Sequence, residues 1–137
     1  MNESNSTTVT ATKHVLIIDD DPEISESIKY ALTGNGFEVS VARDGNQGLA
    51  FAETQNPDLV ILDMMMPKRS GFLVLERMRQ QSETPVPVIM ITANEGSRHQ
   101  EYAELLGVDD YILKPFTMDR LLSSVSKLVT DLSLIHI

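Results

Sequence analysis

Several side chains suited to metal or phosphate chemistry stand directly after runs of apolar residues. The runs "HVLII", "LVIL", "VIMI" and "YIL" are followed at once by Asp19-Asp20, Asp63, Thr92 and Lys114, respectively. An uncompensated carboxylate beside apolar packing is costly, so each acid needs a partner, water or a task. We therefore ask which elements carry these groups and whether the fold brings them together.

The intervening chain alternates short apolar segments with longer segments of helical periodicity. The patterns predict strands at residues 14–19, 37–42, 58–63, 85–92 and 109–113. Helices are predicted within residues 21–36, 44–55, 71–81, 96–106 and 117–132. Asp21 is the expected N-cap of the first helix, and Pro22 is its expected first residue.

Five such β–α units predict an α/β domain, a doubly wound five-stranded parallel sheet of the flavodoxin-like type with helices on both faces. The first, third and fourth apolar segments suit central strands, whereas the alternating "FEVSVA" suits an edge. The expected strand order is 2-1-3-4-5. The carboxyl ends of all strands then share one rim, and ligands bind where the order reverses. At the edge strand, Ala42-Arg43, we predict no comparable functional group.

The groups expected at this rim form a chemically coherent set. Three carboxylates packed together repel one another unless a proton or a cation compensates. Oxygen ligands without His or Cys favour a hard divalent ion such as Mg²⁺. Such an ion, Lys114 and the Thr92 hydroxyl could together cover the oxygens of a phosphoryl group. A carboxylate can itself become an aspartyl phosphate, and Asp63 is the best placed nucleophile.

With these segments in this order, the sequence resembles the receiver domains of bacterial two-component response regulators. The resemblance covers about residues 13–132. It rests on "VLIIDDDP", "PDLVILDMMMPKRSG", "VPVIMITA" and "GVDDYILKPF". Each segment alone is weak, and the four together at these spacings are highly specific.

The resemblance implies a Mg²⁺ site, for which Mn²⁺ is a substitute. Its members are Asp63 as phosphoacceptor and direct ligand, Asp20 as a direct ligand, the main-chain carbonyl of Met65, and Asp19 acting through water. Pro67 and Gly71 are expected to shape the loop that carries this carbonyl. Met65 and Asn94 stand where the family varies, so the lifetime of the phosphoryl group is left open.

The resemblance also implies a conformational switch. Thr92 is expected to be the switch hydroxyl, Tyr111 the aromatic switch and Lys114 the cation that contacts the phosphoryl group. The Lys114–Pro115 bond is where the family usually has a cis peptide. The last two strand–helix units would then form a face, made of the fourth helix, the fifth strand and the fifth helix, that changes its partner preference.

As a function, the resemblance implies a phosphorylation-activated signalling switch. Asp63 would accept a phosphoryl group from a histidine kinase or a histidine phosphotransfer protein. The domain would be no enzyme beyond catalysing its own phosphotransfer and autodephosphorylation. We expect a monomer or a weak phosphorylation-dependent dimer, controlling an output domain or protein that the sequence does not identify.

Composition excludes several other functions. The chain has 20 acidic and 11 basic residues and a formal charge of −9, with the basic residues scattered, which argues against direct nucleic-acid binding. It has no cysteine, which excludes disulfides and thiolate catalysis. No segment has the length of a transmembrane helix or the pattern of a signal peptide, so we expect a cytoplasmic protein without membrane contact.

Three alternatives use the same fold class. A Mg²⁺-dependent phosphatase with an aspartyl-phosphate intermediate normally has a second acid two residues after the nucleophile, and Met65 stands there. Flavodoxin-like mononucleotide binding requires a Ser/Thr/Gly-rich loop after the first strand, where this chain has acids. A degenerate receiver that serves only as an interaction module is expected to lack Asp63, Asp20 or Lys114, and all three are present.

The predicted organisation is a single domain between short flanking segments. Residues 1–12 are rich in Ser, Thr and Asn and are expected to be a disordered leader, residues 13–132 the receiver domain, and residues 133–137 a tail or the start of a linker. Whether the chain is a stand-alone receiver or part of a larger regulator or hybrid kinase is left open.

Overall fold

The computed structural model describes residues 12–66, 70–81, 85–93 and 96–134. Within these residues strands and helices alternate along the chain. Their order is β2 (His14–Ile18), α1 (Pro22–Gly34), β3 (Glu38–Ala42), α2 (Gly45–Gln55), β4 (Leu59–Asp63), α3 (Gly71–Gln81), β5 (Val88–Thr92), α4 (Ser97–Leu105), β6 (Asp110–Leu113) and α5 (Met118–Leu134).

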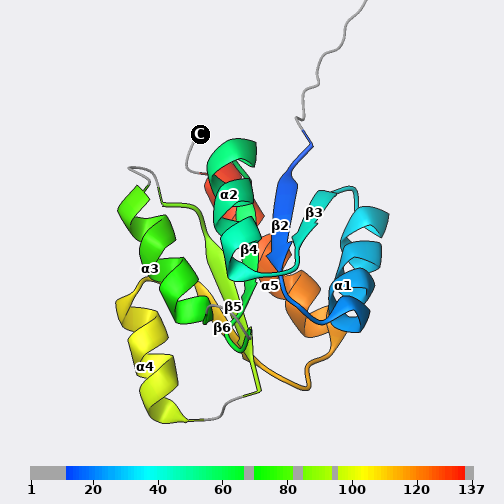
Figure 1. The fold of residues 1–137 in the computed structure, drawn as a ribbon. Coiled ribbons are helices and arrows are strands. Elements are labelled where there is room, and N and C mark those ends of the chain that lie inside the picture. The colour runs from blue at the N-terminus through cyan, green and yellow to red at the C-terminus, as the bar shows by residue number, and fades with distance from the viewer. Residues whose placement is uncertain (1–11, 67–69, 82–84, 94–95, 135–137) are drawn as a thin grey trace, which may run out of the picture.

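The strands form one parallel sheet in the order β3-β2-β4-β5-β6 (Figure 1). Numbered along the chain this is 2-1-3-4-5, which confirms the predicted order. β4 and β5 are buried at every position, whereas β3 is buried only at its last residue, as expected for an edge strand. The order reverses between β2 and β4, so the crevice for a ligand lies at the carboxyl ends of these two strands.

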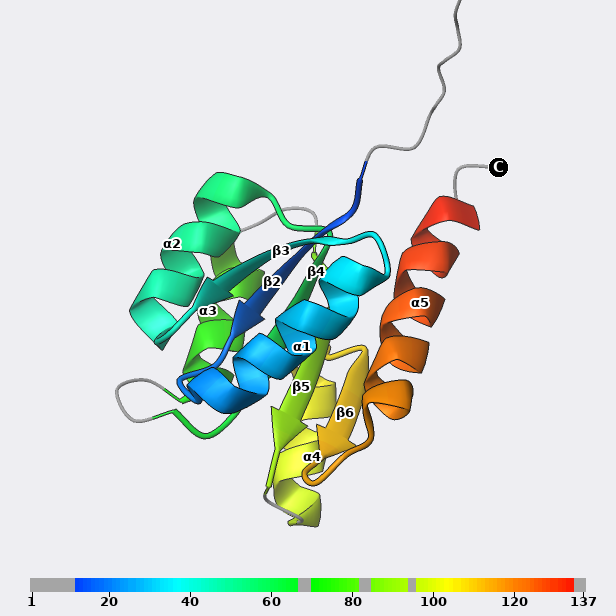
Figure 2. The ribbon, with the colours of Figure 1, turned by 90° about the vertical axis from the view of Figure 1, so that its right-hand side faces the viewer.

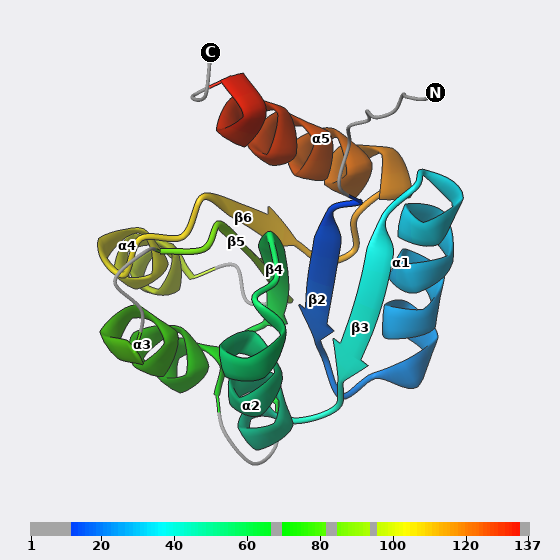
Figure 3. The same cartoon turned by 90° about the horizontal axis from the view of Figure 1, so that it is seen from above.

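Helices cover both faces of the sheet (Figure 3). α1 and α5 lie on one face, which Figure 2 shows with α1 in front of the strands, and α2, α3 and α4 lie on the other. Alternate residues of each central strand therefore enter different cores. In β2, for example, Ile17 packs with Ile28 of α1 and Leu121 of α5, whereas Ile18 belongs to the cluster that includes Leu75 of α3. Each fully buried aliphatic side chain stabilises the fold by roughly 1.5–3 kcal/mol before entropic costs.

The first two helices each begin at an aspartate N-cap, and the cap of α1 is the predicted one. The Asp21 side chain accepts hydrogen bonds from the amides of Glu23 and Ile24, and Pro22 is the first residue of α1, as predicted. The Asp44 side chain caps α2 by accepting from the Gln47 amide. These caps define the residue at which each helix begins after its strand.

Several strands are shorter than their apolar pattern. β5 begins at Val88 rather than at residue 85, because Pro85 and Pro87 have no amide hydrogen for the ladder. β4 begins at Leu59 because Asp58 caps the neighbouring strand: the His14 amide donates to Asp58 Oδ2 at 2.8 Å. β2 ends at Ile18, which leaves Asp19 just beyond the strand. At the other end of the chain α5 continues to Leu134, past the predicted end at residue 132.

Candidate functional site

The polar groups that follow the apolar strands lie along one edge of the sheet. Asp63 and Thr92 are the last residues of β4 and β5, while Asp19 and Lys114 come directly after β2 and β6. The strands are parallel and in close register, with Asp63 opposite Ile91 and Thr92 opposite Leu113. These strand ends lie side by side because strand pairing in the sheet aligns them, although they are far apart in the sequence.

Three carboxylates form a compact cluster at this edge. One side-chain oxygen from each of Asp19, Asp20 and Asp63 lies within 4.8 Å of the others. Asp19 and Asp63 are buried, with 2% and 3% of their surface exposed, whereas Asp20 is open to solvent. Among the described residues this is the group of acidic and histidine side chains that could hold a metal ion.

Lys114 brings a cation to this cluster. Its Nζ lies 3.5 Å from Asp63 Oδ1, and its side chain is 21% exposed. Burial raises the pKa of Asp63, while the Lys114 ammonium and the Met65 amide act in the opposite direction. Among the described residues, the three carboxylates outnumber this ammonium, so this part of the site has an excess of negative charge.

Burial has its clearest effect on Asp19. Desolvation raises the pKa of its carboxyl to about 6, against a hydrogen bond from the Asp21 amide and with a further increase from the nearby charge of Asp63. Two buried oxygen donors and one exposed donor, with neither sulfur nor imidazole, fit a hard divalent cation. The carboxylate cluster is therefore the part of the site that a metal ion would neutralise.

The segment after Asp63 is held close to the cluster by main-chain contacts. The Met65 amide donates to Asp63 Oδ1 at 3.1 Å, and the Gly71 amide donates to the Met64 carbonyl at 2.9 Å. A Cβ atom at Gly71 would lie 2.6 Å from the Asp63 carbonyl oxygen and 2.7 Å from Met64 Cα. Only glycine fits this approach of α3 to the end of β4. Met65 is 59% exposed, and its contact with the cluster is made by its main-chain amide.

Two residues of the expected site fall in segments without a described structure. Pro67 and Asn94 lie outside the described residues. Their expected effects on the loop geometry and on the lifetime of a phosphoryl group therefore stay predictions.

The residues expected to switch lie on the β5–β6 side of the site. Thr92 is fully buried at the end of β5, and its carbonyl accepts a hydrogen bond from the Lys114 amide at 2.8 Å. Tyr111 is half-buried in β6, opposite Met90, and packs against the core beneath α2, α3 and α4. Burial raises the pKa of its hydroxyl. The Lys114–Pro115 peptide bond is cis.

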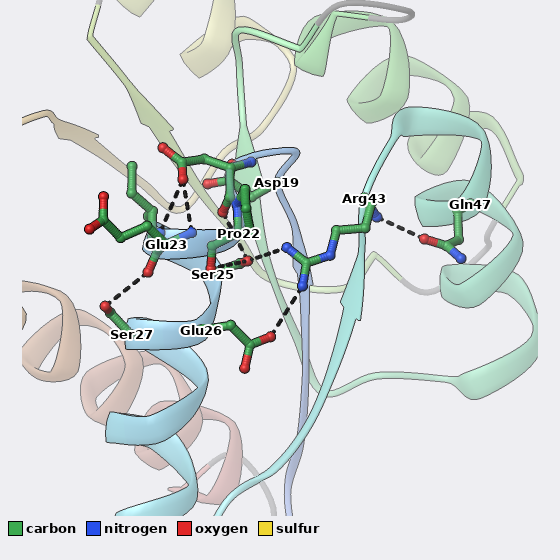
Figure 4. Close-up of polar contacts among 10 residues, drawn as sticks. Asp19, Pro22, Glu23, Ser25, Glu26, Ser27, Arg43 and Gln47 are labelled. Atoms are coloured by element: carbon green, nitrogen blue, oxygen red, sulfur yellow. Dashed lines mark hydrogen bonds and ion pairs between the residues drawn. The ribbon is translucent and has the colours of Figure 1, made fainter.

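One residue at the rim has contacts that the sequence reasoning missed. Arg43, directly after β3, extends its guanidinium to Ser25 and Glu26 of α1 (Figure 4). A cation at the end of a strand on the functional rim was the available signal, but its acceptors are 17 and 18 residues away in sequence.

The fold and this carboxylate edge define the chain as an α/β protein of the receiver class, and comparisons with known proteins identify the family. The family model for the response regulator receiver domain matches residues 15–126. The chain belongs to this family. It is accordingly a phosphorylation-activated switch of two-component signalling, a signalling domain rather than a classical enzyme.

Individual relatives agree with this assignment. The chain is 40% identical over 116 residues to the DNA-binding dual master transcriptional regulator RpaA of Synechocystis sp., which covers 84% of this chain and 48% of RpaA. The Francisella response regulator 1452 receiver domain superposes with a TM-score of 0.82 at 34% identity, covering 88% of this chain and 98% of that one.

The response regulator TrrA of Thermotoga maritima, solved in complex with Mg(2+)-BeF, has a TM-score of 0.76 at 34% identity, covering 85% of this chain and 99% of that one. The chain spans about half the length of the curated relatives it matches. Among the residues that the structure describes, no helix combines the length and the apolar character needed to cross a bilayer.

Proposed function

We propose that Asp63 is the residue that accepts the phosphoryl group. The observation that carries this proposal is its position: a buried carboxylate at the end of a central strand, inside the acidic cluster and 3.5 Å from Lys114 Nζ. Asp19 and Asp20 lie on its β2 side and Lys114 and Thr92 on its β5–β6 side. Of the three clustered carboxylates, Asp63 is the one that lies between the other two acids and Lys114.

The residues of this edge fit a Mg²⁺ ion, with Mn²⁺ as a substitute. Asp20, Asp63 and the main-chain carbonyl of Met65 would hold it directly, and Asp19 would act through water. When bound, the ion offsets the negative charge that accumulates on the phosphoryl oxygens. TrrA, the Thermotoga maritima relative, was solved with a Mg(2+)-BeF complex, which supports a divalent ion at a receiver site of this kind.

The chain's own groups perform the transfer. An ionised oxygen of Asp63 attacks the phosphorus of a phosphohistidine, a P–O bond forms, and the P–N bond breaks with its electron pair returning to the imidazole. The Lys114 ammonium, already next to Asp63, favours the ionised nucleophile and then pairs with a phosphoryl oxygen. The same residues would later admit water to hydrolyse the aspartyl phosphate, which is the autodephosphorylation reaction.

The phosphoryl group would change the surface through Thr92 and Tyr111. It adds a charge of about −1.5 to −2 and new hydrogen-bond acceptors next to the buried Thr92 hydroxyl. A shift of Thr92 leaves room for Tyr111 on the neighbouring strand to reorient, which alters the face formed by α4, β6 and α5. A local change in charge at Asp63 would thus shift the α4–β6–α5 face between two conformations.

The partners follow from this chemistry. A histidine kinase or a histidine phosphotransfer protein would donate the phosphoryl group, and the α4–β6–α5 face would control an output domain or protein, with at most weak phosphorylation-dependent dimerisation. The relative RpaA is named as a DNA-binding transcriptional regulator, and it is about twice as long as the matched segment. The charge of −9 argues that any DNA contact belongs to other sequence.

Intact-mass analysis after incubation with acetyl phosphate and Mg²⁺ tests the assignment. The native chain should gain one phosphoryl group, and an Asp63→Asn variant should gain none while its fold is unchanged by circular dichroism. A Glu53→Gln variant removes an exposed carboxylate of α2 and serves as the matched control, with labelling equal to the native chain. No adduct on the native chain, or an equal adduct on Asp63→Asn, contradicts the proposal. Turnover of free phosphomonoesters would instead support the phosphatase alternative.

A further inference from the structure

Arg43 connects the end of β3 to α1, which follows the acidic loop (residues 19–21), and to α2. Its Nη1 donates to Ser25 Oγ at 2.8 Å and its Nη2 to Glu26 Oε2 at 3.2 Å, both on α1. Its main-chain amide donates to Gln47 Oε1 of α2 at 2.7 Å. Figure 4 shows the guanidinium extending from the end of β3 toward Ser25 and Glu26, with Gln47 on the opposite side. Arg43 is thereby held at its backbone by one helix and contacts the other with its side chain.

Ser25 links Arg43 to the backbone of Asp21 by hydrogen bonds. Its side chain is fully buried, and Oγ lies 2.9 Å from the Asp21 carbonyl oxygen and 3.3 Å from that of Pro22. A hydroxyl has one proton to donate and two lone pairs to accept with. Ser25 therefore accepts from Arg43 while it donates to a carbonyl, and a buried hydroxyl of this kind is rarely left without partners.

Asp21 in turn fixes the side chain of Asp19. Its amide donates to Asp19 Oδ1 at 2.8 Å, and its carbonyl also accepts from the Ser25 amide at 3.0 Å. Its own carboxylate accepts from the Glu23 amide at 2.9 Å. The Asp21 residue is thus held on both sides, and its amide is aimed at a carboxylate of the cluster.

We propose that Arg43 is a positioning residue for the acidic loop. Acting through Ser25 and the Asp21 backbone, it fixes the orientation of the Asp19 carboxylate and so raises the affinity of the cluster for a divalent cation. Its guanidinium contacts Ser25 and Glu26 and none of the three clustered carboxylates, so its effect on the cation is geometric. The inference rests on the proposed function, because the cation concerned is the one that Asp20 and Asp63 would bind.

The expected effect is a weaker Mg²⁺ complex with an intact fold. Removing an outer partner of a metal ligand typically costs 10–100-fold in affinity, and Arg43 acts one contact further away, so we expect Arg43→Ala to weaken Mg²⁺ binding about three- to tenfold. Ser25→Ala should have a similar effect. The double variant should be no worse than Ser25→Ala alone, because both substitutions break the same chain of hydrogen bonds. Arg43→Lys keeps a donor within reach of Ser25 and should retain most of the affinity.

The experiment is a Mg²⁺ titration of the full chain by calorimetry, with amide NMR of the metal-free protein as a second readout. In Arg43→Ala the Asp21 amide should shift and exchange faster with solvent, while the denaturation midpoint stays close to the native value. Glu26→Ala breaks only the exposed ion pair, and Lys29→Ala removes a cation of α1. Both controls should leave the Mg²⁺ affinity and the Asp21 amide unchanged.

Three results would overturn the inference. One is a native Mg²⁺ affinity and Asp21 amide signal in Arg43→Ala. Another is an equal loss in Lys29→Ala, which would make the effect unspecific, since removing a positive charge alone should raise the affinity for a cation. The third is an additive loss in the double variant. Failure of the proposed function would look different, since Asp63 would then take no phosphoryl group while these binding measurements could still follow the expected pattern.

Discussion

At the scale of single residues, the site is defined by carboxylates held where their charge is unfavourable. Asp19 and Asp63 are buried next to one another, and Lys114 forms an ion pair with Asp63. Burial raises the pKa of both carboxyl groups. Buried, ionised carboxylates lower the stability of the ligand-free protein, and functional sites commonly retain such groups because they bind a ligand.

The pH dependence of the free energy of unfolding should show how much the ionised, buried Asp19 carboxylate destabilises the fold. Its pKa in the folded protein is about 6, above the value of about 3.9 for an unfolded chain, so folding favours the protonated form. The cost is absent below about pH 4, develops as the pH rises to about 6, and is complete above that value. Asp19→Asn should therefore stabilise the metal-free protein by on the order of 1–3 kcal/mol near pH 7.5 and have little effect near pH 4.

Urea unfolding in EDTA at both pH values measures this difference. Asp20→Asn provides the matched control, because it removes the same charge from an exposed position and should stabilise less. A stabilisation by Asp19→Asn that is the same at both pH values would contradict the assignment of the cost to an ionised, buried carboxylate.

At the scale of elements, helix placement determines where the site residues lie. α3 begins at Gly71, in contact with the end of β4, and Arg79 near its other end donates to the carbonyls of Val86 and Gly107, both at 2.8 Å. The helix is therefore tied to β4 at one end and to the connections before β5 and before β6 at the other. The position of α3 relative to Asp63 is thus set at two separate points.

Gly71→Ala should disturb this placement. The added Cβ would meet main-chain atoms of Asp63 and Met64 at 2.6 and 2.7 Å, and backbone has little room to move. We expect a loss of roughly 1–3 kcal/mol in the free energy of unfolding and slower labelling by acetyl phosphate. Gly34→Ala is the control, since a Cβ there has no atom within 4 Å. It should be neutral or slightly stabilising, and equal losses in both variants would refute the steric argument.

A charged contact fastens the last helix to the sheet. Arg120 of α5 donates to both carboxylate oxygens of Asp110 in β6, at 2.9 and 3.0 Å, and Ser124 Oγ donates to Oδ2 at 2.6 Å. The hydrogen bonds from Arg120 lower the pKa of Asp110 to about 2, against its partial burial. Because the folded pKa lies below the unfolded one, this stabilisation is complete above about pH 4 and is lost as the pH falls through about 2.

A double-mutant cycle of Asp110→Asn and Arg120→Ala should give a coupling of about 1 kcal/mol at neutral pH, discounted for solvent exposure. The coupling should decrease steadily in urea titrations as the pH falls from about 4 toward 2. A coupling that does not change over this interval would show that the contact is not ionic. The cycle also reports on the α4–β6–α5 face, because both residues belong to it.

At the scale of the whole molecule, two hydrophobic cores stabilise the domain and the acidic edge opposes them. The apolar clusters on the two faces of the sheet involve residues from every strand and helix. The formal charge of −9 adds a general repulsion to the local one. A divalent cation at the edge should therefore raise the stability of the entire chain.

Mg²⁺ should raise the Tm of the native chain by an amount that grows with the logarithm of its concentration once that concentration exceeds Kd. At a concentration tenfold above Kd the stabilisation is about 1.4 kcal/mol, which corresponds to a shift of roughly 5 °C for a domain of this size. Asp63→Asn should start from a higher metal-free Tm and respond much less to Mg²⁺. NaCl at matched ionic strength controls for general screening, and an equal shift with NaCl would show that no specific site is involved.

The strand order and the residues that gather at the carboxyl edge could both be predicted from the amino-acid sequence. This was possible because both follow from local patterns: apolar runs identify the central strands, and the residue after each run must lie at a shared rim once the strands are parallel. The caps of the first helix were likewise readable, since an N-cap interacts within its own turn.

The contacts that depend on how the helices pack against the sheet could be known only from the folded structure. The reach of Arg43 to Ser25, the three-point contact of Arg79 with the connections before β5 and β6, and the fit of Gly71 against Asp63 depend on where helices pack. When a side chain donates to an acceptor 18 or more residues away, no local sequence pattern identifies that acceptor. The hydrogen bond forms only if the packing of whole helices and strands brings donor and acceptor to the right distance within tenths of an ångström.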